Sequence, residues 1–258
     1  MKAQGGGPGN SSGEGYMEAD KRAQGEAERR VAGLDEILDL VVHELRNPVA
    51  VMKGFATSIE GAADNMDPEA MKKAARAIHR SADRLDALLN SLSDVRSLDA
   101  DSFRIDRKQV LLSSVVRNAV EGQTLIMQGH RVTTTIEDDV LLYVDPVRIG
   151  QVLTNLISNA MKFSPRHSLV EITASREDGE AHICVKDQGA GIPASRAHEI
   201  FDKFTRLNPT VNGSGIGLYI SRGIARAHGG ELELVESARG CTFLLRLPVY
   251  AEGQPDPR

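Results

Sequence analysis

The segment QVLTNLISNAMKF, residues Gln151 to Phe163, carries an unusual set of polar side chains within a helical pattern of apolar residues. Asn155 and Asn159 are four residues apart and therefore share a helix face, and Lys162 follows three residues later. Asparagine disfavours helix interiors and needs a partner when it is buried. A neutral oxygen ligand for Mg²⁺ beside a cation for phosphate would explain the set, and a solvated polar face is the simpler alternative.

Two glycine-rich stretches follow this segment. DQGAGIP begins at Asp187, directly after a strand-like run. Its glycines would let the backbone approach a ligand closely, and the aspartate would accept a hydrogen bond from an amine of that ligand. The same pattern also makes an ordinary turn. NGSGIGLYI begins at Asn212 and opens a helix, where exposed backbone amides favour an anion, although a structural turn with a cap would look the same.

The surrounding sequence mixes short strands with helices and predicts an α/β sandwich, with helices on one face of a mixed sheet. The strand candidates are FRIDRKQ, RVTTTIE, LLYV, LVEITASRE, EAHICVKD, ELELVES and CTFLLRLPV, and the helical ones are LLSSVVRNAVEGQTLI, DPVRIGQVLTNLISNAMKF and GIGLYISRGIARAH. Cys184 and Cys241 lie in two of the strands. Two buried thiols are favoured over a disulfide between them, and no cluster has zinc spacing.

Taken in order, these motifs resemble the Bergerat ATP-binding fold, which histidine kinases share with gyrase-type ATPases, Hsp90 and MutL. The asparagine helix, DQGAGIP, FDKF, GSGIGL and GCTF resemble its N, G1, F, G2 and G3 boxes. DPVRIGQVLTNLISNAMKFSP is closest to the histidine-kinase version, and the resemblance covers about Phe103 to Val249.

The resemblance implies ATP and Mg²⁺ as ligands and a role for each matching position. It implies that Asn159 coordinates Mg²⁺, that Asn155 and Lys162 contact phosphates, and that Asp187 accepts the adenine amino group. The adenine pocket would be shaped by Gly189, Gly191 and Ile192, with Thr242 nearby. The lid would run from Gln188 to Ser214, anchored by Phe201 and Phe204, with Arg206 near the γ-phosphate. The phosphate cradle would comprise Gly213, Ser214, Gly215, Ile216, Gly217 and Leu218. Cys241 departs from the pattern, because a second glycine is usual there.

The first half of the chain predicts a helical hairpin. One apolar helical pattern runs from about Ala19 to Ile59, and a second begins with Asp67 as N-cap and Pro68 at the first helical position. The intervening turn is GAADNMD. Both helices carry apolar stripes wider than one partner helix covers, so a four-helix bundle in a homodimer is favoured over packing against the same chain.

HELRNP, residues His43 to Pro48, resembles the H box of HisKA-type sensor histidine kinases. The resemblance implies that His43 is the phosphoacceptor. Glu44 is the candidate general base, and Asn47 would hold a water against an aspartyl phosphate on a docked partner. The other six histidines are expected to be structural or solvated.

Pro48 lacks the backbone N–H that a helix residue donates, and a proline inside a helix lowers its stability by roughly 3 kcal/mol. It removes the hydrogen bond to the carbonyl of Glu44. We hypothesise that the resulting bend switches His43 between a pose facing the ATP domain and one facing the partner. A kink that merely fits the bundle explains the proline equally well.

Together these motifs predict an ATP-dependent protein-histidine kinase that passes its phosphoryl group to an aspartate of a response regulator and also dephosphorylates that regulator. The alternative is a Bergerat-fold ATPase or a nucleotide-gated scaffold without phosphohistidine. The expected divisions are a disordered tail over 1–18, a dimerisation and phosphotransfer hairpin over 19–100, a catalytic ATP-binding domain over 101–250 and a tail over 251–258.

Composition agrees with this interpretation. The chain has 258 residues, of which 41% are hydrophobic and 26% charged, and its net charge is −5, which gives no electrostatic reason to expect nucleic-acid binding. No apolar run approaches the ~20 residues that span a membrane, and the N-terminus lacks an apolar signal core. A cytoplasmic protein, or the soluble cytoplasmic portion of a membrane-associated kinase, is expected, with a possible separate sensory partner.

Overall fold

The computed structural model describes residues 41–62, 66–123, 129–208, 213–235, 237 and 239–250. The chain divides into two compact units, Met1–Ala82 and Asp83–Arg258. Both predicted tails, 1–18 and 251–258, lie outside the described residues, as does the first half of the first predicted helix. No helix among the described ranges is long and apolar enough to cross a bilayer.

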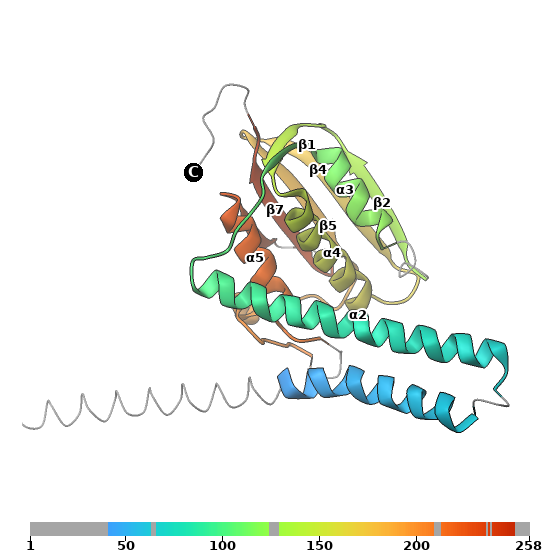
Figure 1. Cartoon of the computed structure of the whole chain (residues 1–258). Coiled ribbons are helices and arrows are strands. Elements are labelled where there is room, and N and C mark those ends of the chain that lie inside the picture. Colours follow the sequence, from blue (N-terminus) through green and yellow to red (C-terminus); the bar gives the residue numbers. More distant parts are fainter. Residues whose placement is uncertain are drawn as a thin grey trace, which may run out of the picture. The chain divides into compact units, whose positions relative to one another are not determined.

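The helical hairpin is confirmed (Figure 1). Residues 41–62 form one uninterrupted helix through Pro48, and helix α2 runs from Pro68 to Asp99. The second helix begins where Asp67 and Pro68 predicted, and the amide of Met71 donates to the carbonyl of Asp67 over 3.0 Å. Proline suits this position because the first-turn amide that it lacks has no intrahelical partner.

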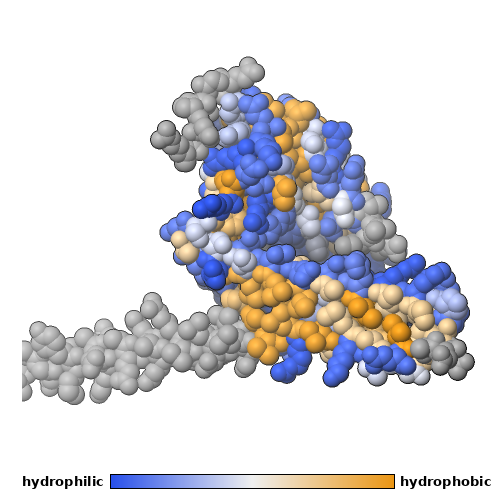
Figure 2. All heavy atoms as spheres, in the orientation of Figure 1, coloured by the Kyte–Doolittle hydropathy of each residue, from blue (hydrophilic) through white to orange (hydrophobic). Residues whose placement is uncertain are grey.

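Apolar side chains remain exposed on the hairpin, as its wide stripes predicted (Figure 2). The exposed fraction is 46% for Val42, 47% for Val49 and 50% for Leu89. A single chain therefore leaves apolar surface that a second copy could cover.

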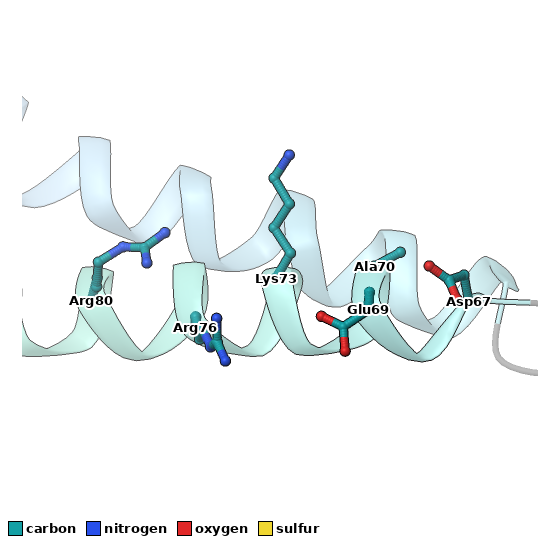
Figure 3. A pocket seen from close by; sticks show the side chains of 6 residues that line it. All are labelled: Asp67, Glu69, Ala70, Lys73, Arg76 and Arg80. Atoms are coloured by element: carbon teal, nitrogen blue, oxygen red, sulfur yellow. The ribbon is translucent and has the colours of Figure 1, made fainter.

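A polar depression also lies on the hairpin, near its turn (Figure 3). It is lined by Asp67, Glu69, Ala70, Lys73, Arg76 and Arg80. None of these residues belongs to the predicted nucleotide or phosphoacceptor sites.

The second unit contains the predicted mixed sheet. Its five strands lie in the order β2-β4-β5-β7-β6, with β2 and β4 parallel and the remaining neighbours antiparallel. Their bounds are Arg131–Ile136 for β2, Leu169–Glu177 for β4, Glu180–Lys186 for β5, Thr242–Pro248 for β7 and Glu231–Val235 for β6. A separate two-stranded sheet pairs β1 (Lys108–Leu111) with β3 (Leu141–Val144).

Three helices cover one face of the five-stranded sheet (Figure 1): α3 (Leu112–Glu121), α4 (Pro146–Phe163) and α5 (Gly217–Ala227). Every second residue of the central strands is buried beneath them, as the alternating pattern EAHICVK of β5 illustrates. Asp145 caps α4 by accepting from the amides of Val147 and Arg148, and Pro146 occupies the first helical position. The predicted α/β sandwich is confirmed.

Two local expectations are refined. The strand expected over FRIDRKQ begins only at Lys108 and continues past that stretch to Leu111, because the preceding residues contact helices instead of a strand. Arg107 donates to the carbonyl of Ala227 at the end of α5, and the ring of Phe103 lies 4.8 Å from the guanidinium carbon of Arg148. Both cysteines are free thiols, as favoured, although Cys184 is only half-buried.

Candidate functional site

Asp187 lies at the end of β5 with 4% of its surface exposed. Its Oδ1 accepts two backbone hydrogen bonds, from Gly189 at 2.7 Å and from Cys241 at 3.1 Å, and its own amide donates to the carbonyl of Cys241. Within the described ranges, no protein donor binds Oδ2. The carboxylate is therefore fixed in orientation by one oxygen and can accept from a ligand amine with the other.

Glycine is required at two points around this aspartate. A Cβ on Gly189 would lie 2.7 Å from the carbonyl oxygen of Phe163, and one on Gly240 would lie 2.1 Å from that of Asp187. Gly240 also has φ +73. The departure at Cys241 causes no backbone strain, since Cys241 is not among the described non-glycine residues with positive φ. Our sequence interpretation did not single out Gly240, although it opens the GCTF motif.

Asn155 links α4 to α5. Its Nδ2 donates to the hydroxyl of the buried Ser221 over 3.0 Å, and a Cβ on Gly217 would lie 2.5 Å from its Oδ1. The first asparagine of the predicted pair is thus positioned against the N-terminus of α5. Sequence analysis missed Ser221, because nothing local to LYISRG distinguishes a partner of Asn155 from a solvated serine.

The other two polar residues of α4 lie one and two turns further on. Asn159 is half-buried, and Lys162 is exposed. The Nζ of Lys162 would be 2.8 Å from a Cβ on Gly213, so this lysine reaches the glycine loop, which we define as residues Gly213–Leu218. The structure therefore brings the N-box lysine and the G2 glycines together.

The glycine loop leads into α5, whose N-cap residue Ile216 makes no side-chain cap. First-turn amides at such a helix start can bind an anion. Gly215 has φ +70, and a Cβ there would lie 2.6 Å from the carbonyl carbon of Phe204. Phe204 itself has φ 63, a left-handed conformation that is unusual for a bulky residue.

The remaining predicted residues surround these elements. Phe201 is buried in the core, and the partly buried side chains of Ile192, Phe204 and Leu218 pack against that core. Thr242 begins β7 opposite Lys186, beside Asp187. Gly191, Ser214 and Arg206 are half-buried, and residues 209–212 of the predicted lid lie outside the described part of the chain.

Phe163 is a further candidate that our sequence interpretation missed. It is the last residue of α4, its side chain is exposed, and its carbonyl lies against Gly189. An exposed aromatic ring, on a residue whose backbone adjoins the Asp187 turn, offers a flat apolar surface to a planar base. Aromatic character is visible in the sequence, but exposure is not.

The helix of residues 41–62 presents the residues of the HELRNP motif on two faces. His43 and Asn47 are exposed and four residues apart, whereas Glu44, with 7% of its surface exposed, and Pro48 are buried. The histidine and the amide therefore share an accessible face. The proposed switching role of Pro48 stays a prediction.

The side chains near the glycine loop suit a magnesium ion that is held mainly by the phosphates of a bound nucleotide. Among the described residues, no group of three His, Cys, Asp or Glu side chains could hold a metal ion by itself. Asn159, half-buried one turn beyond Asn155, offers a neutral amide oxygen on the helix that also presents Lys162. Mg²⁺ is commonly bound through one or two protein oxygens plus substrate phosphates, so these residues fit it.

This layered fold, with a fixed aspartate after a central strand and a glycine loop at a helix start, defines a nucleotide-binding domain of the Bergerat class. Residues 144–251 match the family described as histidine kinase-, DNA gyrase B- and HSP90-like ATPases. Residues 22–101 match the His Kinase A (phospho-acceptor) domain. The chain therefore belongs to the sensor histidine kinases, with an acceptor domain followed by an ATPase-type domain.

Relatives agree with this assignment. The sensor protein TorS of Escherichia coli is 33% identical over 92% of this chain, and the sensor histidine kinase WalK of Bacillus subtilis is 29% identical over 86%. The chain spans only 26% and 37% of their respective lengths. Among solved structures, the mycobacterial kinase MprB matches 56% of this chain and 98% of its own, with 27% identity and a TM-score of 0.52. The kinase ThkA, solved in complex with the response regulator TrrA, matches 91% of this chain and 67% of its own, with 24% identity and a TM-score of 0.59.

Proposed function

We propose that this chain uses ATP to phosphorylate His43 and passes the phosphoryl group to an aspartate of a response regulator. The observation that carries the proposal is the pairing of an exposed His43 on an acceptor helix with a nucleotide domain in which Asp187 keeps one carboxylate oxygen open. A ring nitrogen of neutral imidazole can attack the γ-phosphoryl group.

Each element of the nucleotide domain has a defined task in this proposal. Oδ2 of Asp187 accepts a hydrogen bond from the adenine amine, and the ring of Phe163 contacts the base. Amides of the glycine loop hold the phosphates, with Lys162 supplying positive charge. Bound Mg²⁺ would neutralise charge between the β- and γ-phosphates, and Asn159 would provide the protein ligand.

Glu44 is the proposed base that takes the proton from the other ring nitrogen as His43 attacks. Glu44 is nearly buried on a different face from His43, so its side chain must turn toward the ring for this step. Asn47, exposed beside His43, would orient water against a regulator's aspartyl phosphate. The same helix would thus serve both a kinase and a phosphatase reaction.

The proposed assembly is a homodimer built on the hairpin, which a response-regulator receiver domain approaches in the cytoplasm. Exposed Val42, Val49 and Leu89 support the dimer. The complex of ThkA with TrrA supports the choice of partner, since ThkA shares this fold. We retain 19–100 and 101–250 as the proposed functional domains.

The test is incubation of the full chain with γ-labelled ATP and Mg²⁺, followed by measurement of label stability in acid and base. Wild type should acquire acid-labile, base-stable label. His43→Gln should abolish labelling with ATP binding intact, and His79→Gln, a change of another exposed hairpin histidine, should not. Steady ATP turnover without labelled protein would favour the ATPase alternative, and absence of nucleotide binding would favour a scaffold.

A further inference from the structure

The C-terminal end of α2 is built into the nucleotide-binding unit at three points. Asp94 binds α4, Leu98 lies on α5, and Asp99 binds both the FDKF segment and α5. A Cβ on Gly223 would be 2.6 Å from Leu98, so α5 has a glycine where this leucine packs. Since α2 is continuous from Pro68 to Asp99, these contacts attach the second hairpin helix to the elements that surround the nucleotide site.

The two aspartates differ in the strength of attachment that they provide. The Asp94 side chain is 9% exposed and accepts from Arg148 at 2.9 Å and from Gln151 at 3.0 Å. Breaking it would leave a buried charge unpaired, which is strongly unfavourable. The Asp99 side chain is 42% exposed and its partner Lys203 is 33% exposed, so water can replace this pair at small cost. The Asp94 contact is therefore the stronger attachment of α2, and the Asp99 contact is the weaker one.

Asp99 connects the two segments that flank the glycine loop. Its Oδ1 accepts from the hydroxyl of Tyr219 at 2.6 Å and from Lys203 at 2.5 Å, and the lysine also lies 4.9 Å from the centre of the tyrosine ring. The hydrogen bond from Lys203 lowers the pKa of Asp99. Burial and the hydrogen bond to Asp99 raise the pKa of Tyr219 to about 12, so the hydroxyl remains a donor across the physiological range.

Lys203 is joined to the glycine loop through a strained neighbour. Phe204 follows it directly with φ 63, and its carbonyl carbon lies where a Cβ on Gly215 would collide. Tyr219 lies two residues after Gly217, in the first turn of α5. Phosphates bound by the amides of the glycine loop would therefore displace both partners of Asp99. Backbone strain at Phe204 favours such a displacement, because movement of this segment can relieve it.

We propose that Asp99, Lys203 and Tyr219 form a latch that holds the end of α2 while the nucleotide site is empty and opens when ATP binds. This rests on the proposed function, since it assigns a regulation to the same site. The latch restrains α2, and opening it removes one restraint on delivery of the γ-phosphoryl group to His43. Asp94 keeps the rest of the attachment in place.

The test is amide hydrogen exchange of the full chain with and without Mg²⁺ and a non-hydrolysable ATP analogue. The reporters are the amides of Ala100 and Ser102, which donate to the carbonyls of Arg96 and Ser97. In wild type, nucleotide should protect residues 217–221 and speed exchange at the reporters by about two- to fivefold, the range expected for an exposed ion pair. Asp99→Asn should exchange at the fast rate without nucleotide.

Asp101→Asn is the matched control, since it removes the same charge from a described residue whose side chain has no partner within the described ranges. It should behave as wild type. Protection at 217–221 with no change at the reporters would overturn the latch and leave ATP binding standing. Absence of any protection would overturn both the latch and the proposed function. Asp99→Asn and Tyr219→Phe should also autophosphorylate about two- to fivefold faster, and slower labelling would contradict a restraining role.

Discussion

The backbone amide of Cys241 donates to Oδ1 of Asp187 over 3.1 Å, and these two residues are 54 positions apart in the chain. The bond joins the start of β7 to the end of β5 and fixes which carboxylate oxygen faces the ligand space. Gly240 permits the approach, because any side chain there would overlap the carbonyl of Asp187. The orientation of the predicted adenine acceptor is thus set by backbone groups.

Replacement of Asp187 by asparagine should weaken ATP binding about 10- to 100-fold without unfolding the domain. An amide can satisfy the two backbone donors through its oxygen, but it then presents NH₂ to the adenine amine, donor against donor. Titration calorimetry with ATP measures the effect. Asp178→Asn, at the β4–β5 turn where φ is 50, is the control and should bind normally. Equal affinities for all three proteins would refute the assignment.

Gly215→Ala should abolish ATP binding and lower the stability of the domain by more than about 1 kcal/mol, since the position combines positive φ with a collision against Phe204. Gly150→Ala is the matched control, because its Cβ would meet nothing within 4 Å in the α4 helix. That control should stabilise by about 0.5–1 kcal/mol and bind ATP normally. Urea denaturation and ATP titration of both variants provide the comparison.

Asn47→Ala should preserve much of the autokinase activity and remove most of the phosphatase activity, because the exposed amide is proposed to position water and takes no part in attack on ATP. Glu44→Gln should slow autophosphorylation by about 10²- to 10⁴-fold, the usual contribution of a general base. Autophosphorylation rates and decay of regulator phosphate measure both. Equal loss of the two activities in Asn47→Ala would mean that Asn47 supports the docking surface.

His228 should make the nucleotide-binding unit less stable in mild acid. The buried ring accepts from the amide of Asp145 through Nε2 and contacts the carbonyl of Ile224 through Nδ1, an arrangement that needs the neutral form. Burial lowers the pKa of His228 below its ordinary value of about 6.5. Above that value both folded and unfolded states carry a neutral ring. As pH falls below it the unfolded chain binds a proton first, so the free energy of unfolding decreases.

Urea denaturation at pH 7.5 and 5.5 measures this contribution. His228→Gln should cost about 1–3 kcal/mol at pH 7.5, through lost buried hydrogen bonds, and should show a smaller further loss at pH 5.5 than wild type. His198→Gln, at an exposed histidine, should follow wild type at both values. An unchanged pH dependence in His228→Gln would assign the acid sensitivity to other groups.

The sequence alone determined the hairpin, the mixed α/β layer and the order of the motifs, because these depend on local periodicity, caps and short-range spacing. The sequence spacing also placed three polar residues on one helix, Asn155, Asn159 and Lys162, because spacing in a helix fixes the direction in which each side chain points. Pro68 located a helix start for the same reason.

Only the tertiary structure decided which distant groups meet. Ser221 holds Asn155, Cys241 orients Asp187, and the backbone carbonyl of Phe163 lies against Gly189 while its ring remains exposed. Asp99 meets Lys203 and Tyr219 more than 100 residues along the chain. Such contacts depend on how strands and helices pack across long separations, and local sequence carries no signal for which serine, amide or carboxylate will lie opposite another.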